Sequence, residues 1–440
     1  MNGGALRRWG VAAVIVAVVA TACTTSRGNK AAKTTGRSSA SSQGEALGQG
    51  VTAGTIKIGF SYIDLEALAK TGIIKIDHGP YEQIITALVD DLNKRGGING
   101  RQVELVTAKF SAIGNTDQLA ACTKFTEDDK VFAVLNGFLG NNDLCVVQQH
   151  QTILIGGTSS DAQHAQARAP WVTWDPSAER SIDALVRALG EAGDLKGHTI
   201  AVYAAQAAYK PLLDVGAKAL KDAGYKVADV AFNDAPDNDV QAAAAQDKVI
   251  AQRMTSERVD TVVDVGQFIP GADFDAAGFH PRLYSTSVGN IAAAVFTNPL
   301  GKFPLVAGLA APGAELSDPA MQRCVQVWKQ ATGKDIVGPE QEDLQGRSSG
   351  YVAMQIACSS LDLFTAAAKA AGKNLNNETF AKGLATLSHI DLPDAPDASF
   401  GPDKFDGQDR FQLQKLDPTW KQGSGKPQFV DVGPAFTLTR

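Results

Sequence analysis

The sequence predicts an α/β protein made of two doubly wound lobes, each built on a parallel sheet. Short β-branched runs alternate with amphipathic helical stretches along the chain, which is the pattern of parallel strands joined by right-handed crossovers. The same rhythm stops at a loop-like stretch with two prolines, ARAPWVTWDPSAERS (residues 167–181), and then starts again. We therefore expect two lobes that face each other rather than one long sheet.

The elements of the first half follow from apolar periodicity and from glycine stops. Tyr81–Lys94 places Ile84, Ile85, Leu88, Val89 and Leu92 on one helical face, and GGING ends that helix. The predicted strands are residues 55–63, 102–108, 131–137 and the start of 152–160, and the predicted helices are residues 81–94, 116–125 and 142–150.

The second half repeats this order after a helix predicted over residues 181–193. Its predicted strands are residues 199–206, 226–232, 261–266 and 282–288, and its predicted helices are residues 211–223 and 240–253. Ligands of open α/β sheets gather at the carboxyl ends of the strands. Two such lobes predict a ligand cleft between them.

The N-terminus has the pattern of an export signal. Arg7 and Arg8 precede an apolar core, residues 11–20, that is about half of the ~20 residues needed to cross a bilayer. Small residues follow and lead to Cys23, an order that resembles the lipobox of bacterial lipoproteins. Residues 1–22 are thus predicted to be a signal peptide, and Cys23 to be lipidated; an ordinary secretory signal is the alternative.

Residues 23–50 are predicted to be the lipidated cysteine and a flexible tether. The stretch after Cys23 is rich in Ser, Thr, Gly, Lys, Ala and Gln and has no aromatic residue, so it cannot bury enough apolar surface to order itself. This combination predicts a body held by a lipid anchor at the outer face of the cytoplasmic membrane. No later segment is expected to span a membrane.

Charge and cysteine content limit the possible partners. The 41 basic and 47 acidic residues give a net charge of −6, and no basic tract indicates nucleic-acid binding. Four cysteines remain after Cys23, and four cysteines allow three disulfide connectivities. We favour Cys122–Cys145 and Cys324–Cys358, because each pair joins neighbouring elements of an exported chain. Buried free thiols are the alternative.

Several motifs of the chain belong to one recognisable pattern. The most specific is the string Asp91, Asn93, Gly96, Gly97, Ile98, Gly100, and IKIGFS, FTEDDKVFAVLNGFLG, AQAAY (205–209) and FGPDKFDG (400–407) agree with it. Together they resemble the type I periplasmic binding proteins, and most closely the leucine/isoleucine/valine-binding branch of ABC-transporter receptors. The resemblance covers residues 55 to about 432.

The resemblance implies a two-lobe fold whose hinge consists of three chain crossings. We place the crossings near residues 172–176, at 287–290 and within 392–402. Lobe one is then residues 55–172 plus 290–395, and lobe two is residues 173–289 plus 396–440. It also implies a monomer without cofactor or metal that passes a small polar organic solute to an ABC permease.

By alignment to that family, the ligand contacts are assigned to loops at the strand ends. In lobe one they are Ser61 and Tyr62 in the opening loop, Phe138, Leu139 and Gly140 in the second, and Thr158 and Ser159 in the third. In lobe two they are Tyr209, Gln267, Phe268 and Thr286, within the run from Ser285 to Ser287. Exposed backbone N–H groups and hydroxyls of the glycine-bearing loops are expected to bind a carboxylate or a carbonyl.

The chain departs from the amino-acid-binding members at one position. They carry a carboxylate for the ligand's ammonium on the loop that here reads Ser285-Thr286-Ser287. Because a buried unpaired ammonium is costly, either another acid supplies the charge or the ligand has no ammonium. Asp264 is the nearest replacement, with Asp64 and Glu66 as further candidates.

Motifs for catalysis give little support for an enzyme. GRSSG (346–350) matches GxSxG, but the polar PEQEDLQ precedes it instead of the strand that a nucleophile elbow requires. The six histidines show no metal-ligand spacing. The resemblance therefore leads us to predict a solute-binding receptor. A ligand-sensing receptor of the same fold is the second candidate, and an exported hydrolase using Ser348 is the third.

Overall fold

The computed structural model describes residues 46–65, 78–112, 114–157, 159–236, 239–266, 268–297, 300–338, 350–419 and 428–439. The predicted signal peptide and Cys23 lie outside these ranges, as do Glu66, Thr158, Gln267 and Ser348. The last residues of the predicted tether already belong to the body: the Gly48 N–H donates to the Leu375 carbonyl at 2.9 Å. The amide of Asn376 donates to the Ala46 carbonyl at 3.0 Å.

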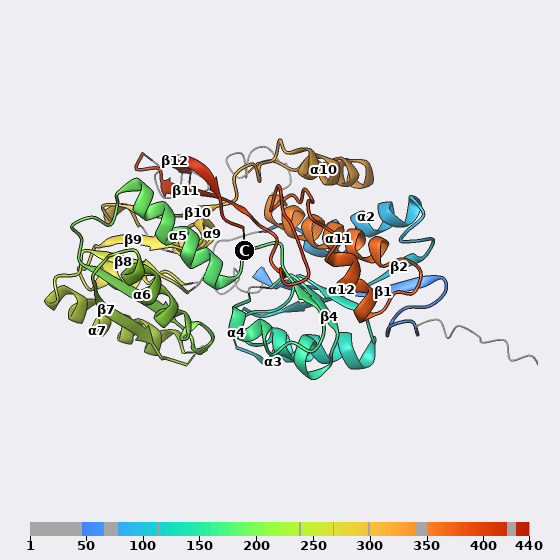
Figure 1. Cartoon of the computed structure of the whole chain (residues 1–440), viewed down its shortest axis with the longest axis horizontal. Coiled ribbons are helices and arrows are strands. Elements are labelled where there is room, and N and C mark those ends of the chain that lie inside the picture. The colour runs from blue at the N-terminus through green and yellow to red at the C-terminus, as the bar shows by residue number, and fades with distance from the viewer. Residues whose placement is uncertain are drawn as a thin grey trace, which may run out of the picture. The chain divides into compact units, whose positions relative to one another are not determined.

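The first sheet has five parallel strands in the order β2-β1-β3-β4-β5 (Figure 1). These strands are β1 (Thr55–Ile63), β2 (Gln102–Phe110), β3 (Ala133–Leu135), β4 (Ile153–Ile155) and β5 (Trp171–Val172). Strand order reverses at β1, so the loops after β1 and β3 diverge there. We call the body around this sheet lobe one.

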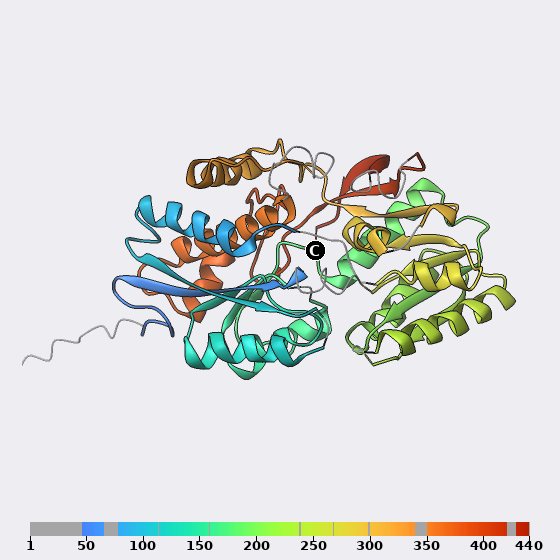
Figure 2. The same ribbon diagram turned by 180° about the vertical axis from the view of Figure 1, so that it is seen from behind.

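The second sheet has seven strands in the order β12-β11-β10-β9-β8-β6-β7, and the view from behind shows it beside the first sheet (Figure 2). The strands β6 (Ile200–Ala205), β7 (Val227–Asn233), β8 (Thr261–Asp264), β9 (Arg282–Ser285) and β10 (Val306–Ala310) are parallel, and β11 (Arg410–Leu416) and β12 (Phe429–Thr437) are antiparallel. We call the body around it lobe two. Its strand order reverses at β6.

Helices cover both faces of each sheet. In lobe one these are α2 (Tyr81–Lys94), α3 (Thr116–Thr123), η1 (Lys124–Asp128), η2 (Cys145–Gln149), α4 (Asp161–His164), α10 (Pro319–Thr332), α11 (Tyr351–Ala371) and α12 (Asn377–Leu384). In lobe two they are α5 (Ala178–Ala192), η3 (Ala207–Tyr209), α6 (Leu212–Asp222), α7 (Val240–Ser256), α8 (Gly271–Ala276), α9 (Val288–Thr297) and η4 (Leu300–Lys302).

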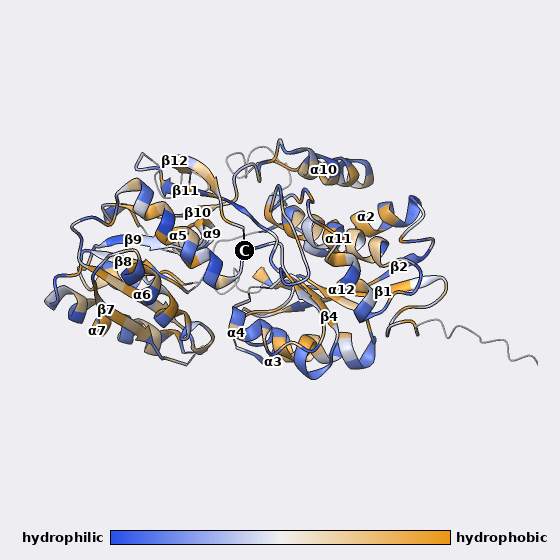
Figure 3. Cartoon of the chain, viewed as in Figure 1, coloured by the Kyte–Doolittle hydropathy of each residue, from blue (hydrophilic) through white to orange (hydrophobic). Residues whose placement is uncertain are grey.

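Each sheet separates two apolar layers, because alternate strand residues point to opposite faces. In lobe one, Ile58 and Ile155 belong to the layer formed with α2 and α11, whereas Leu154 belongs to the layer formed with α3 and η2. In lobe two, Val202 packs with α5 and α6, and Tyr203 packs with α7 and α8. Coloured by hydropathy, the strands are largely hydrophobic and the outer sides of the helices are polar (Figure 3).

One helix corrects the expectation that no later segment could span a membrane. Tyr351–Ala371 (α11) is long and apolar enough by length and composition. However, 72% of its most apolar window is buried inside the protein, where it packs against α2 and α12. It is the central core helix of lobe one.

Strand pairing also moves the second predicted crossing. We expected the chain to return to lobe one at residues 287–290, but β10 pairs in parallel with β9 and α9 packs against both strands. The return therefore follows Ala310 and precedes α10, which packs against α2 and α11. A short, buried apolar run such as VAGLA carries no periodicity that assigns it to a sheet.

The third crossing lies later than the predicted start of lobe two at residue 396. Ala398 and Phe400 are part of the lobe-one core, and the Phe400 N–H donates to the Leu387 carbonyl at 2.7 Å. The first crossing is next to the third: the Thr173 N–H donates to the Phe405 carbonyl at 3.0 Å, and the Gly407 N–H to the Thr173 carbonyl at 2.9 Å. These two crossings form the paired part of the hinge.

The structure contains the two favoured disulfides. Cys122 at the end of α3 is bonded to Cys145 at the start of η2, and Cys324 of α10 is bonded to Cys358 of α11. Both bonds lie in lobe one, on opposite faces of its sheet.

Candidate functional site

A cavity of about 690 Å³ lies between the lobes and against the hinge. Lobe two lines it with the ends of strands β8 and β9, with η3 and with the first turn of α9. Lobe one contributes His78, the first turns of α11 and Asp394. The hinge contributes residues 175–176, 311–315 and 408. We call this cavity the cleft.

Two predicted contact residues line the cleft. Tyr209 follows β6, where the strand order of lobe two reverses, and Thr286 follows β9. The Tyr209 ring is 6% exposed and packs on the apolar layer of α5 and α6. Gln206, three residues earlier, has a φ of 65°, so the chain turns sharply between the strand and the tyrosine. Both residues thus occupy the carboxyl edge at which α/β sheets bind ligands.

The opening-loop candidates lie outside the lining of the cleft. Ser61 is fully buried, and its hydroxyl donates to the Gly137 carbonyl at 2.6 Å. The Tyr62 hydroxyl donates to Glu82 at 3.0 Å. Burial, together with the Glu82 carboxylate, raises the pKa of Tyr62 to about 12. Ser61 therefore supports the next loop, and Tyr62 packs along α2.

The loop after β3 has its backbone donors occupied, contrary to the expectation that they face a ligand. The Phe138 N–H donates to Asp143 at 2.6 Å, and the Leu139 N–H donates to Gln118 at 2.8 Å. The Phe138 ring is buried edge-on against Phe110. Phe138 and Leu139 thus fix the shape of this loop through lobe-one contacts.

Asp143 also lies close against the loop after β4. A Cβ added at Gly157 would lie 2.2 Å from the Asp143 Oδ2 atom, so only glycine fits there. Burial raises the pKa of Asp143 well above its usual range. The Oδ1 atom of this buried carboxyl group thus binds the loop after β3, whereas its Oδ2 atom, beside Gly157, has no hydrogen-bond partner among the described residues.

Gly140 and Ser159 lie where the lobes approach each other. A Cβ added at Gly140 would lie 3.6 Å from the Cβ of Ala208, in lobe two. The Ser159 carbonyl accepts the Ala178 N–H of α5 at 3.0 Å. The Ser159 hydroxyl is buried and has no hydrogen-bond partner among the described residues. Neither residue lines the cleft in this conformation.

Asp264 is the last residue of β8, and Phe268 lies in the loop that follows this strand. Asp264 is buried and accepts hydrogen bonds from the Gly266 N–H at 3.0 Å and from Ser285 Oγ at 3.4 Å. Phe268 is 49% exposed and does not line the cleft. Asp264 therefore supports Ser285, the last residue of β9, through this hydrogen bond. Of the other acids considered, Asp64 forms an ion pair with Lys109 at 2.7 Å.

Asp264 gives a prediction about pH. Burial raises the pKa of Asp264 to about 8, so the folded state binds this proton more tightly than the unfolded state does. The stability that it contributes is complete below pH 4 and is lost as the pH rises toward 8. Because each pKa unit corresponds to about 1.4 kcal/mol, we expect Asp264→Asn to remove at least about 2 kcal/mol of pH dependence from urea unfolding between pH 4 and pH 8. An equal dependence of the free energy of unfolding on pH in the wild type and in Asp264→Asn would contradict this prediction.

Sequence reasoning missed the carboxylates of the cleft. Asp175 in the first crossing and Asp394 after α12 both line it, as do the exposed Glu315 and Asp431. Asp394 accepts the indole N–H of Trp174 at 3.0 Å. Burial, and then the charge of Asp394, raises the pKa of Asp175 to about 8, and burial raises that of Asp394. No sequence signal joins two aspartates so far apart in the chain.

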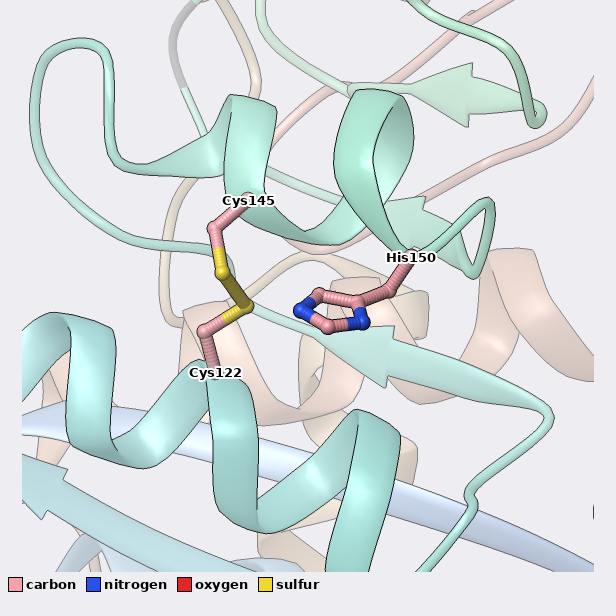
Figure 4. Close-up of side chains that lie close together, drawn as sticks. All are labelled: Cys122, Cys145 and His150. Carbon is pink, nitrogen blue, oxygen red and sulfur yellow. A yellow bond between two sulfur atoms is a disulfide. The ribbon is translucent and has the colours of Figure 1, made fainter. Parts of the chain in front are cut away.

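Three groups of side chains have metal-ligand proximity among the described residues. His150 lies beside Cys122 and Cys145 (Figure 4), but these sulfurs form a disulfide and offer no thiolate. The same holds for Cys324 and Cys358 beside Asp362. The third group, His389, Asp391 and Asp397, is exposed.

Comparisons with known proteins agree with this architecture. The family described as periplasmic binding protein matches residues 55–421. A fatty acid ABC transporter substrate-binding protein from Thermomonospora curvata superposes with a TM-score of 0.61 at 18% identity, covering 90% of this chain and 95% of that chain. No curated protein sequence matches the chain.

Two further solved structures have the same fold. A solute-binding protein of an ABC transporter from R. palustris, in complex with 4-hydroxybenzoate, has a TM-score of 0.61 at 14% identity and covers 87% of this chain and 97% of that chain. A possible leucine/isoleucine/valine-binding protein from Rhodopirellula baltica SH 1 has a TM-score of 0.61 at 13% identity and covers 86% of this chain and 96% of that chain.

Proposed function

Because this chain belongs to the periplasmic binding protein family, we propose that it is an extracytoplasmic receptor that captures a small organic molecule in the cleft and delivers it to an ABC permease. The observation that carries the proposal is the cavity of about 690 Å³, which is lined by both lobes and by the hinge crossings. Its size is within the range of small-molecule sites in proteins. The solved relatives named above are described as ABC-transporter binding proteins, which supports the permease as partner.

The proposed mechanism is closure about the hinge. Tyr209 and Thr286 belong to lobe two, and His78 and Tyr351 belong to lobe one, so a molecule in the cleft can contact both bodies. A ligand that makes more contacts in the closed form shifts the open–closed equilibrium toward it. The permease then distinguishes the loaded receptor by its closed shape.

A capture experiment tests this function. The purified full-length chain in detergent is incubated with the ultrafiltered small-molecule fraction of a cell extract, and retained compounds are identified by native mass spectrometry. We expect a retained compound and, on saturation with it, a smaller radius of gyration by X-ray scattering. Retention of no compound would contradict the receptor function, and unchanged scattering on saturation would contradict closure.

Tyr209 is expected to contribute to binding through its ring. Tyr209→Ala removes an aromatic face of the cleft, and we expect calorimetry to show a loss of about 1–3 kcal/mol in binding of the retained compound. Tyr209→Phe keeps the ring and should lose less. Tyr225→Ala, which removes a partly buried tyrosine of lobe two outside the cleft lining, is the control. Wild-type affinity in Tyr209→Ala would place the ligand elsewhere.

We also propose that Cys23 carries the membrane anchor, since Ala20-Thr21-Ala22-Cys23 has the order of a lipobox. Cys23→Ser should move the protein from the membrane fraction to the soluble exported fraction, because serine has no sulfur atom to form the thioether bond to the lipid. Immunoblots of the two fractions measure this. A wild-type protein whose mass shows no acyl chains would contradict it.

A further inference from the structure

The charge of the cleft is one-sided. Four carboxylates line it, at Asp175, Asp394, Glu315 and Asp431, whereas the described lining contains no lysine or arginine. The one lining residue there that can become cationic is His78, whose ring bonds the Tyr81 hydroxyl at 2.8 Å. A molecule that enters the cleft therefore meets an excess of negative charge.

Two of these carboxylates form a close pair at the hinge. Asp175 precedes Pro176 in the first crossing, and Asp394 is held by the Trp174 indole at 3.0 Å and, through its backbone N–H, by Ser359 Oγ at 3.1 Å. Both carboxyl groups line the same cavity, and burial together with the charge of Asp394 raises the pKa of Asp175. In the described part of the chain, the Asp175 carboxylate has no hydrogen bond and no ion pair.

Such a pair is unfavourable without a cation. Two carboxylates that share a half-buried site repel each other when both are ionised, and each has lost part of its hydration, so without a cation the pair retains a proton. A purely structural role explains Asp394, which orients Trp174, but it leaves Asp175 unexplained. A positive charge placed between the two would satisfy both.

We propose that the ligand carries a positively charged nitrogen, and that Asp175 and Asp394 bind this group at the hinge side of the cleft. The proposal rests on the proposed receptor function and names the class of its ligand, an organic cation. The body of that cation would contact the apolar lining, which includes Tyr209, Val265, Leu309 and Ile356. Closure would then bring the two lobes together around a ligand whose cationic nitrogen is already bound by Asp175 and Asp394 at the hinge.

The first turn of α9 also lines the cleft and favours the opposite ligand charge. A helix N-terminus has a partial positive charge of about half an elementary charge and favours anions. The Gly289 N–H of that turn is already bonded to Ser287 Oγ at 3.0 Å. The partial positive charge of this helix N-terminus is smaller than the charge that the four acidic side chains can carry. The turn can therefore bind a polar end of the ligand, while the cleft as a whole still favours a cation.

The test uses two probes of matched size and opposite charge, phenethylamine and phenylacetate, and the compound retained from the cell extract. The proteins are the full-length chain, the variant Asp175→Asn/Asp394→Asn, and a control with the same charge change on exposed aspartates of α2 and α6, Asp90→Asn/Asp214→Asn. Calorimetry in detergent measures affinity, and thermal unfolding confirms that each protein is folded.

We expect the retained compound to carry a cationic nitrogen, and phenethylamine to bind in preference to phenylacetate. The cleft variant should bind both cations at least tenfold more weakly, while the control variant should bind them as the wild type does. Because the pair repels itself, the cleft variant should unfold at the same temperature as the wild type or higher.

The outcomes separate the two proposals. Retention of an anionic or neutral compound, a preference for phenylacetate, or unchanged affinity in the folded cleft variant would overturn the cation assignment and leave the receptor function intact. Retention of no compound by any of the proteins would overturn the receptor function and the cation assignment together.

Discussion

Asp406→Ala is expected to lower the free energy of unfolding by about 3–5 kcal/mol, because it breaks a buried ion pair and leaves its partner uncompensated. Asp406 lies in the third crossing with its side chain fully buried, and its Oδ1 atom is 2.7 Å from Arg180 of α5. Its Oδ2 atom accepts the N–H of Ser177, the N-cap residue of that helix, at 2.7 Å. One carboxylate thus holds the N-terminus of α5 to the hinge.

The surrounding charges cannot replace Asp406. Arg180 also contacts Asp409 at 2.9 Å, but Asp409 already binds Lys404 at 3.2 Å. The side chains of this cluster are at most 14% exposed, and this burial lowers the pKa of Lys404. Without Asp406, two buried cations face one carboxylate, and the Ser177 N–H loses its acceptor.

Urea unfolding of the full-length chain at neutral pH measures this effect. Asp406→Asn keeps an acceptor for Ser177 and should cost less than Asp406→Ala. Glu191→Ala, which breaks the exposed pair with Arg187, is the control and should cost less than about 1 kcal/mol. If Asp406→Ala were no more destabilising than Glu191→Ala, the network would not hold the hinge.

Local pattern predicted the elements that carry their own periodicity. The strand at residues 55–63 and the helix at residues 81–94 have the predicted bounds. The helix has a continuous apolar face and is followed directly by the glycines that end it. The strand is a short run rich in β-branched residues, so both elements could be recognised from their own sequence. Strand β10 was missed because four of its five residues are buried and the run shows no alternation of apolar and polar residues.

The candidate site was less predictable because it depends on distant contacts. Tyr209 and Thr286 could be placed in the cleft from the family resemblance, which assigns ligand contacts to the loops at strand ends. The Phe138 and Leu139 N–H groups could not be recognised as occupied, since their acceptors are side chains, one of them 21 residues away. The pairing of Asp175 with Asp394 depends on how separate crossings meet at the hinge, which no local pattern encodes.

The second large effect concerns the disulfides, and each is expected to contribute about 2–4 kcal/mol, chiefly by restricting the unfolded chain. Cys122–Cys145 closes a loop of 23 residues, and Cys324–Cys358 closes one of 34. Each of the variants Cys122→Ala/Cys145→Ala and Cys324→Ala/Cys358→Ala should therefore shift the urea midpoint downward by a similar amount. The expected similarity follows because loop-closure entropy grows only slowly with length.

Alkylation provides the independent check. Under denaturing, non-reducing conditions we expect no labelling of Cys122, Cys145, Cys324 or Cys358, and labelling of all four after reduction; labelling before reduction would contradict the paired state.

The Cys122–Cys145 bond also has a local consequence. Cys122 and Cys145 bracket the segment that contains Phe138 and Leu139, whose N–H groups donate to Asp143 and Gln118 respectively. Loss of this bond should therefore increase hydrogen exchange at these two N–H groups, whereas loss of Cys324–Cys358 should leave them protected.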